Sequence, residues 1–396
     1  MGKYFELVKM NKYNYYMIIL APLFYISTAY LKKLQIKHFE KNSFDYWDCH
    51  ENTAVYKCKL MNRTIFFFNI FFPKILSVGL FLILKFLIKN NDLLSIKVRE
   101  NNNNIILNNN IRNIIMIVLI FIISILELLY RFESYLQYRY IIKNYIDMKL
   151  GIIFLIPILS FMIINDKIYR HHIVSFLLFS FGIFLIILFL SNIYNEGDYF
   201  GEEIKNFSEQ IKHLLSSIYL SLSYVLTNYL FENFNVNVFF YLVFNGVICF
   251  ILPSFLIFMD FNSGVLLFYD AIANILLIVV AISTFCYYLS NALIIYYLNA
   301  NVLVITETLS LFLKWIIEIL FENKVENEKG SIIFIKILGL LIIIFASMVY
   351  NEILILHFFN FDKNLLNSKN IESIKDKDAI FLKNEDNNIM NDNIRK

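Results

Sequence analysis

Two long apolar segments near the end of the chain, joined by a short charged turn, limit what this sequence can fold into more than any other feature. The hairpin runs from Tyr296 to Glu352, and each segment is long enough for a helix to cross about 30 Å of hydrocarbon, which takes roughly 20 residues. The first segment carries Glu307, Lys314 and Glu318 at spacings that place all three in a narrow sector of a helix. Because a charge at bilayer depth costs at least about 2.5 to 3.5 kcal/mol, this sector must face other helices or water. The hairpin therefore predicts a membrane protein with a polar interior.

The composition extends this prediction to the whole chain. Of its 396 residues, 59% are hydrophobic, whereas a soluble globular domain has about 45 to 50% apolar residues. The net charge of +3 is small, and no segment combines basic and aromatic side chains on a surface, so we expect no nucleic-acid partner. The main surroundings of the chain are expected to be membrane lipids.

The apolar segments predict an all-α membrane protein with ten transmembrane helices arranged as a 5+5 inverted repeat. Five helices in each half place the second half upside down in the membrane, as in many secondary transporters. The predicted spans cover residues 17–30, 65–88, 112–130, 141–164, 173–190, 213–231, 238–259 and 271–297, followed by the two segments of the hairpin. We expect the first repeat at 16–192, with a lumenal loop at 32–64 and an Asn-rich cytosolic loop at 90–111, the second at 212–356, and cytosolic tails at 1–15 and 357–396.

Orientation follows from features of exported loops rather than from charge. Cys49 and Cys58 precede the glycosylation motif at Asn62, and a second motif at Asn206 falls on the same side of the membrane if the spans alternate. Lys and Arg divide about evenly between the two sides, so the positive-inside rule does not decide. We expect both termini in the cytosol and the protein in an endomembrane such as Golgi, endoplasmic reticulum or a lysosome-like compartment. A disulfide between the two cysteines and two free thiols are both left open.

Charged residues within the other spans are candidates for a functional site. Glu127 and Arg131 lie one turn apart in the third span, where each would neutralise the other, whereas Lys74 lies deep in the second span without an evident partner. His171 and His172 are adjacent, so on a helix they point about 100° apart and are not expected to share a metal. We interpret them as interfacial residues, and we expect no metal, cofactor or enzymatic activity.

Polar stripes along two further spans complete the candidate site. The sixth span carries Ser217, Ser221, Tyr224 and Asn228 on one face, and the eighth carries Thr284, Tyr287, Tyr288 and Asn291. Such side chains either hold membrane helices together or contact a ligand, and the sequence leaves both readings open.

The chain resembles the drug/metabolite transporter superfamily, most closely its solute carrier family 35 branch, which includes nucleotide-sugar transporters. The resemblance covers roughly residues 15–355. It depends on two regions: Asp147–Gly151 with the charged turn before His171, and Tyr296–Ala300 through Asn323 and on to Ile337–Leu338–Gly339 and Asn351. It implies that Lys149 is the basic residue of the fourth span that faces a central cavity. The chain departs from the family in the ninth span, where Leu309 and Ser310 stand in place of a basic residue and Lys314 follows about a turn later.

These patterns predict a transporter that moves a small polar metabolite, anionic or nucleotide-linked, across an organellar membrane by alternating access. The alternatives are a transporter-like scaffold that does not transport, and a carrier of cationic drug-like or amino-acid-like solutes. Homodimer formation is left open. The predicted substrate-binding residues are Lys74, Glu127, Arg131, Lys149, Tyr224, Asn228, Tyr287, Asn291, Glu307 and Lys314.

Overall fold

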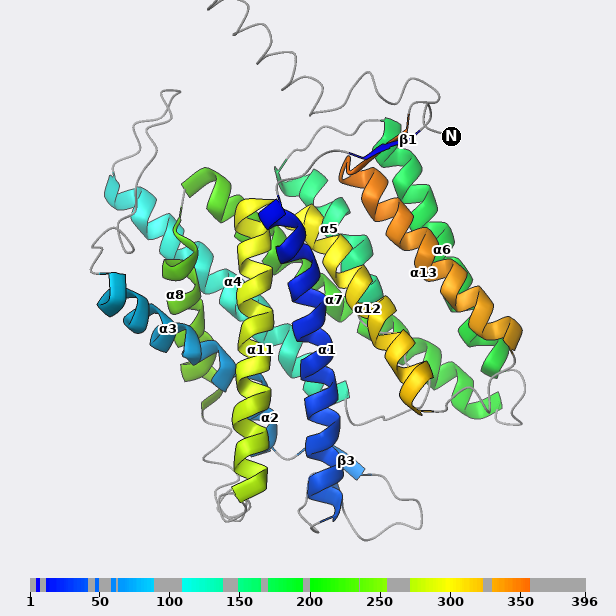
Figure 1. The fold of residues 1–396 in the computed structure, drawn as a ribbon, viewed down its shortest axis with the longest axis horizontal. Coiled ribbons are helices and arrows are strands. Elements are labelled where there is room, and N and C mark those ends of the chain that lie inside the picture. Colours follow the sequence, from blue (N-terminus) through cyan, green and yellow to red (C-terminus); the bar gives the residue numbers. More distant parts are fainter. Residues whose placement is uncertain are drawn as a thin grey trace, which may run out of the picture.

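The fold is built almost entirely from helices (Figure 1). The computed structural model describes residues 5–7, 12–41, 47–49, 58–61, 63–88, 109–137, 149–164, 170–194, 200–234, 236–254, 271–322 and 330–356. The first half contains α1 (Lys12–Lys41), α2 (Arg63–Ile70), α3 (Phe72–Ile88), α4 (Asn109–Gln137), α5 (Lys149–Ile164) and α6 (Arg170–Tyr194). The second half contains α7 (Phe200–Phe234), α8 (Val238–Ile251) with the 3-10 turn η2 (Leu252–Ser254), α11 (Ala271–Tyr297), α12 (Ala300–Glu322) and α13 (Gly330–Tyr350).

Each of the ten predicted spans contains a helix, but several helices begin, break or end at other residues than predicted. The second span breaks at Phe71 into α2 and α3, because Pro73 lacks an amide hydrogen and its ring would collide with the carbonyl four residues earlier. The sixth helix begins at Phe200 rather than at His213, so most of the predicted acidic loop at 191–211 is helical. Glu202 and Glu203 stand in the first turn of α7, where acidic residues favour a helix start.

Four short strands form two antiparallel pairs among the described residues. Strand β1 (Phe5–Leu7) pairs with β4 (Leu354–Leu356), so the beginning of the chain lies beside the end of α13. Strand β2 (Trp47–Cys49) pairs with β3 (Cys58–Met61), within the region predicted as a lumenal loop. That region is also shorter than predicted, because α1 continues to Lys41.

Helices from the two halves interleave (Figure 1). In the centre, α1 packs against α11 and α12. On one side α3 packs against α8, and on the other α6 packs against α13. Helix α7 packs against both α4 and α5, and α5 also packs against α12. Most of the extensive helix contacts therefore join one half of the chain to the other.

Two helices among the described residues are long and apolar enough to cross a membrane by length and composition, and they cover Ile111–Phe132 and Ala271–Tyr297. Shorter apolar helices occur at Phe72–Leu84, Gly151–Ile164, Arg170–Ile186, Val238–Ser254 and Ile337–Tyr350. The helical fold class that the sequence predicts is confirmed at this level, and association with a membrane is consistent with the two long helices.

Helices α6 and α13 cross at close range, where Gly182 and Gly339 face each other. A Cβ added at Gly182 would collide with the Gly339 carbonyl oxygen and with Ile343, and one at Gly339 would press on the Gly182 carbonyl and Ile186. Small residues at such crossings let two helix backbones approach. Hydroxyl groups join α1 to α11 instead, because Ser283 Oγ lies 2.7 Å from Ser27 Oγ and 2.8 Å from Thr28 Oγ1.

Candidate binding site

A small polar cavity lies between α3, α4, α7, α8 and α11, where the two halves of the chain meet. Its volume is about 30 Å³, which is room for about two water molecules at roughly 10 to 15 Å³ each. Its lining mixes charged, phenolic, amide and apolar side chains: Lys74, Glu127, Arg131, Leu220, Tyr224, Thr227, Tyr241, Leu242, Asn245, Tyr288, Asn291, Ala292 and Ile295.

The main charge contact in the cavity is an ion pair between Lys74 Nζ and Glu127 Oε2. Both side chains are about nine-tenths buried, at 11% and 10% exposed. The sequence paired Glu127 with Arg131 and left Lys74 without a partner, and the structure corrects both expectations. Residues 53 positions apart meet here because α3 and α4 both border the cavity, a tertiary contact that helical spacing does not report.

Helix α8 holds the other carboxylate oxygen of Glu127. Asn245 Nδ2 donates to Glu127 Oε1 at 3.2 Å and to the Tyr241 hydroxyl at 2.8 Å. The Tyr241 hydroxyl also lies 3.1 Å from Thr227 Oγ1 on α7, and Cys249 Sγ donates to Asn245 Oδ1 at 3.0 Å. Tyr241, Asn245 and Cys249 are spaced four residues apart, so they share one face of α8. This stripe was not predicted from the sequence, although the same spacing identified the stripes of the sixth and eighth spans.

Two cations flank the ring of Tyr288 on α11. Lys74 Nζ lies 4.3 Å from the ring centroid and Arg131 Cζ lies 5.3 Å from it, and Arg131 also lies 5.2 Å from the Tyr130 ring. An aromatic face attracts a cation without neutralising its charge. In the part of the chain that the structure describes, the Arg131 guanidinium has neither an ion pair nor a hydrogen bond, so its donors remain available beside the cavity.

A second buried carboxylate lies next to the cavity on α12. Glu307 is 1% exposed, and its Oε1 accepts hydrogen bonds from the Tyr287 hydroxyl and, at 3.4 Å, from Asn291 Nδ2. Asn291 itself lines the cavity and is 3% exposed, and its Oδ1 finds no hydrogen-bond partner among the described residues. A buried acceptor without a partner is costly, so this oxygen is a natural contact for a bound donor.

A glycine on α8 brings α3 close enough to place Lys74. A Cβ added at Gly246 would overlap the backbone carbonyl of Lys74 and the hydroxyl of Ser77. Ser77 Oγ in turn donates to the carbonyl of Leu242 on α8 at 2.8 Å. The close approach therefore fixes the start of α3, from which the Lys74 side chain reaches Glu127.

The structure brings together most, but not all, of the predicted substrate-binding residues. Lys74, Glu127, Arg131, Tyr224 and Asn291 line the cavity, and Tyr287 and Glu307 lie next to it through hydrogen bonds. Asn228 does not line it, because its amide donates to Glu232 Oε1 at 2.9 Å within α7. Lys314 lies about two turns beyond Glu307 on α12, outside the lining. Lys149 begins α5, but its side chain lies outside the described residues.

The candidate residues of the predicted lumenal side are described only in part. Cys49 and Cys58 are directly opposite each other in the β2–β3 pair, which is the backbone arrangement that a cross-strand disulfide requires. Their sulfur positions lie outside the described part of the chain, so the disulfide stays a prediction. Asn62 also lies outside it, and Asn206 falls within α7. His171 and His172 are buried against other helices, at 2% and 9% exposed, in the first turn of α6, and their position at a membrane interface stays a prediction.

Comparisons with known proteins do not place the chain in a family. No protein-family model matches it, and no curated protein matches its sequence.

Proposed function

We propose that this protein is a multi-pass membrane transporter that moves a small polar anion by alternating access, with the cavity beside Arg131 as its binding site. The observation that carries the proposal is the charge of the lining. Two cationic side chains, Lys74 and Arg131, accompany one carboxylate, Glu127, and Arg131 has no ion-pair partner among the described residues. An excess positive charge in a buried polar cavity favours an anion, and a guanidinium offers several donors to a carboxylate or phosphate.

The distribution of polar and apolar side chains supports a multi-pass arrangement. Charged and amide groups such as Glu127, Glu307 and Asn245 are buried. Large apolar side chains point outward at helical spacing on α6, α11 and α13: Ile173, Leu177, Phe181, Phe184, Ile272, Ile275, Ile278, Ile282, Phe334, Leu338, Leu341 and Phe345. A water-soluble protein rarely exposes so many large apolar side chains at helical spacing on three helices, whereas a surface that faces lipid is made of such side chains.

The packing of the helices supports an inverted repeat. If α1, α3, α4, α5 and α6 correspond in order to α7, α8, α11, α12 and α13, each extensive contact has its counterpart. The contact of α1 with α11 corresponds to that of α7 with α4, and the contact of α1 with α12 to that of α7 with α5. The pairs α3–α8, α5–α12 and α6–α13 correspond to themselves, as expected for helices on either side of a two-fold axis. The pattern of contacts is therefore unchanged when the two halves are interchanged, as expected for two five-helix units of opposite orientation.

The size of the cavity indicates which conformation of the carrier the structure represents. A space for about two water molecules excludes a nucleotide sugar and most metabolites. We therefore infer a closed state of the carrier, from which α3 and α4 must separate from α7, α8 and α11 for a substrate to bind. The resemblance to drug/metabolite transporters agrees with this mechanism, and an endomembrane is the proposed location.

The test is counterflow uptake by the purified protein in liposomes. The panel contains sugar phosphates, nucleotide sugars, amino acids and cationic drugs, and we expect exchange of a phosphorylated or carboxylated solute. Arg131→Gln should lower that uptake about 10-fold or more, because a hydrogen bond to a charged group contributes about 1.5 to 3 kcal/mol. Arg112→Gln is the matched control, since Arg112 lies at the other end of α4, where it donates to the Asn233 carbonyl at 3.3 Å.

The second candidate function is a scaffold of transporter shape that does not transport. The ion pair between Lys74 and Glu127 and the small volume of the cavity favour it. Absence of counterflow for every solute in the panel, with a folded protein in the liposomes, would support the scaffold. A preference for cationic solutes would instead indicate that the buried carboxylates, rather than Arg131, bind the substrate.

A further inference from the structure

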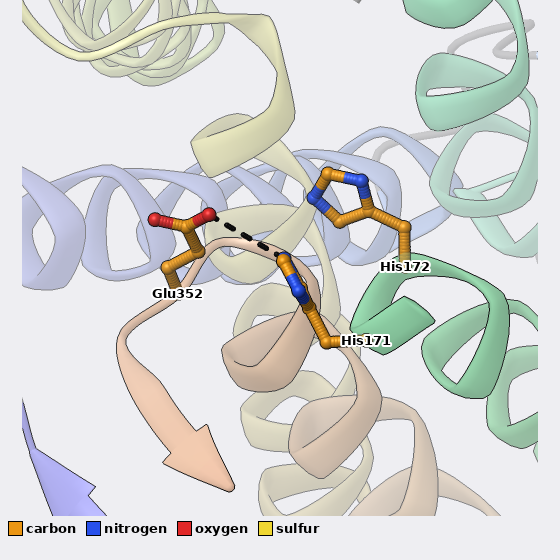
Figure 2. Close-up of side chains that lie close together, drawn as sticks. All are labelled: His171, His172 and Glu352. Atoms are coloured by element: carbon orange, nitrogen blue, oxygen red, sulfur yellow. Dashed lines mark ion pairs between the residues drawn. The ribbon is translucent and has the colours of Figure 1, made fainter. Parts of the chain in front are cut away.

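Two histidines and one glutamate from distant parts of the sequence meet at one end of the α6–α13 pair (Figure 2). His171 and His172 stand in the first turn of α6, and Glu352 follows the end of α13. All three are buried, and one ligand atom from each lies within 4.8 Å of the others. The cavity described above does not involve them.

The adjacent histidines can approach a common point because their rings fold toward each other. The ring centroids of His171 and His172 are 4.1 Å apart, and the His172 ring packs on Tyr350 at 4.7 Å. His171 Nε2 lies 3.4 Å from Glu352 Oε1. Figure 2 shows both rings and the carboxylate bordering the same space. The expectation that neighbouring positions on a helix point too far apart considers the backbone alone and omits the rotation of each side chain.

The backbone at Glu352 adopts a conformation that favours glycine. Its φ is 54°, and it is the one residue other than glycine with a positive φ in the described part of the chain. The amide of Ile353 donates to the Met348 carbonyl at 3.0 Å and the amide of Glu352 donates to the Val349 carbonyl at 3.2 Å, which is the pattern of a Schellman cap. Glycine is the usual residue at this position of the cap. A glutamate there keeps its backbone strain while directing a carboxylate to the histidines, as strained residues at binding sites do.

We propose that His171, His172 and Glu352 bind a divalent transition-metal ion, with Zn²⁺ the best fit. Two imidazoles and one carboxylate form a common protein ligand set for Zn²⁺, and they leave a fourth position for water or another ligand. Bonds of about 2.0 to 2.2 Å in a tetrahedral site place ligand atoms about 3.4 Å apart. The His171–Glu352 separation of 3.4 Å already has this value, and small side-chain rotations bring in His172.

The bound ion would join the two halves of the chain. Helix α6 belongs to the first half and α13 to the second, and their glycine crossing lies within the same pair of helices. The ion would clamp the end of this pair next to the β1–β4 strands, through ligands from the first turn of α6 and from the turn that follows α13. This inference does not depend on the proposed transport function, because it concerns a different set of residues.

Metal binding by the full-length protein in detergent is the test. After removal of metals with a chelator, titration with Zn²⁺ by calorimetry should give one site per chain, and Co²⁺ should give the absorption of a tetrahedral site. Loss of a group that merely orients a metal ligand lowers affinity about 10- to 100-fold, so Glu352→Gln and His172→Gln should lower it by at least that factor. His38→Gln on α1 is the control and should leave the affinity unchanged.

A second variant separates metal binding from a structural role of Glu352. Glu352→Gly removes the carboxylate and suits the positive φ, so this protein should fold at least as well as the wild type without metal. It should also lose the rise in melting temperature that Zn²⁺ gives the wild type. Absence of Zn²⁺ binding to the wild type, or a Zn²⁺ response that survives in both Glu352 variants, would overturn the proposal.

Discussion

The two halves of the chain approach closely at two helix crossings, and glycine has a different role at each. At the α3–α8 crossing, Gly246 lies against the backbone carbonyl of Lys74, whose charged side chain lines the cavity. At the α6–α13 crossing, Gly182 and Gly339 lie against each other, with Ile186 and Ile343 around them. Close approach places a cation beside a polar cavity in the first case and packs apolar side chains in the second.

The α3–α8 crossing positions a charged side chain, whereas the α6–α13 crossing packs apolar side chains. At the α3–α8 crossing, a displacement of the backbone would move Lys74 relative to Glu127. Such a displacement would alter the geometry of the candidate site more than the stability of the fold. At the α6–α13 crossing, the same displacement would open the apolar contact itself. The first crossing should therefore be sensitive in transport and the second in stability.

The largest expected effect comes from breaking the ion pair of the cavity. Glu127→Gln leaves Lys74 buried without its opposite charge, and removal of one partner of a buried pair costs about 3 to 5 kcal/mol. Unfolding of the purified protein in mixed detergent measures the loss. The double variant Lys74→Met with Glu127→Leu should recover most of this stability and still abolish uptake. Equal instability of the single and double variants would show that the loss of stability does not come from leaving Lys74 unpaired.

Next in size is a bulky residue at the α6–α13 crossing. Gly339→Leu would force its side chain against the Gly182 carbonyl and Ile186, and overpacking of this kind costs typically about 1 to 3 kcal/mol. Gly79→Leu is the control, because a Cβ at Gly79 meets nothing within 4 Å. Thermal unfolding should distinguish the two variants, and similar melting temperatures would contradict the close crossing.

A smaller change at the α3–α8 crossing should affect function more than stability. Gly246→Ala adds one methyl group where the Lys74 carbonyl lies, so α3 must shift and carry Lys74 away from Glu127. We expect a loss of stability of about 1 to 2 kcal/mol with a larger proportional loss of counterflow. Gly79→Ala should leave both unchanged or slightly improved. Uptake by Gly246→Ala at the wild-type rate would contradict the proposal that the α3–α8 crossing positions Lys74.

The smallest effect is expected at the hydroxyl contacts between α1 and α11. Ser283→Ala removes hydrogen bonds to Ser27 and Thr28, and such contacts between membrane helices average about 0.6 kcal/mol. Ser290→Ala is the control, because its hydroxyl donates to the Cys286 carbonyl of the same helix at 2.8 Å. Unfolding free energies of the two variants should differ by about that amount.

The sequence predicted the helices from the length of its apolar segments. It predicted much of the candidate site because ionised groups are expensive in an apolar setting and must face inward. This rule identified Lys74, Glu127 and Arg131, and helical spacing added Tyr224 and Asn291. The partner of Glu127 was wrong because spacing along one helix favours the nearest opposite charge, whereas the fold brings Lys74 from another helix.

Other features depend on contacts that no local pattern contains. The meeting of His171 and His172 with Glu352 requires that α6 and α13 pack together and that the chain turn back after Tyr350. The break at Phe71, in contrast, was accessible from the sequence, since Pro73 marks it.

Access of water to the cavity from the two sides of the membrane tests the central claim most directly. The four cysteines of the chain are replaced by serine, and Tyr224, which lines the cavity and is 7% exposed, is replaced by cysteine. A membrane-impermeant maleimide is then added to one side or the other of sealed vesicles. Alternating access predicts labelling from both sides, in proportions that a transported anion changes. Labelling from neither side, or from one side only under every condition, would contradict the account.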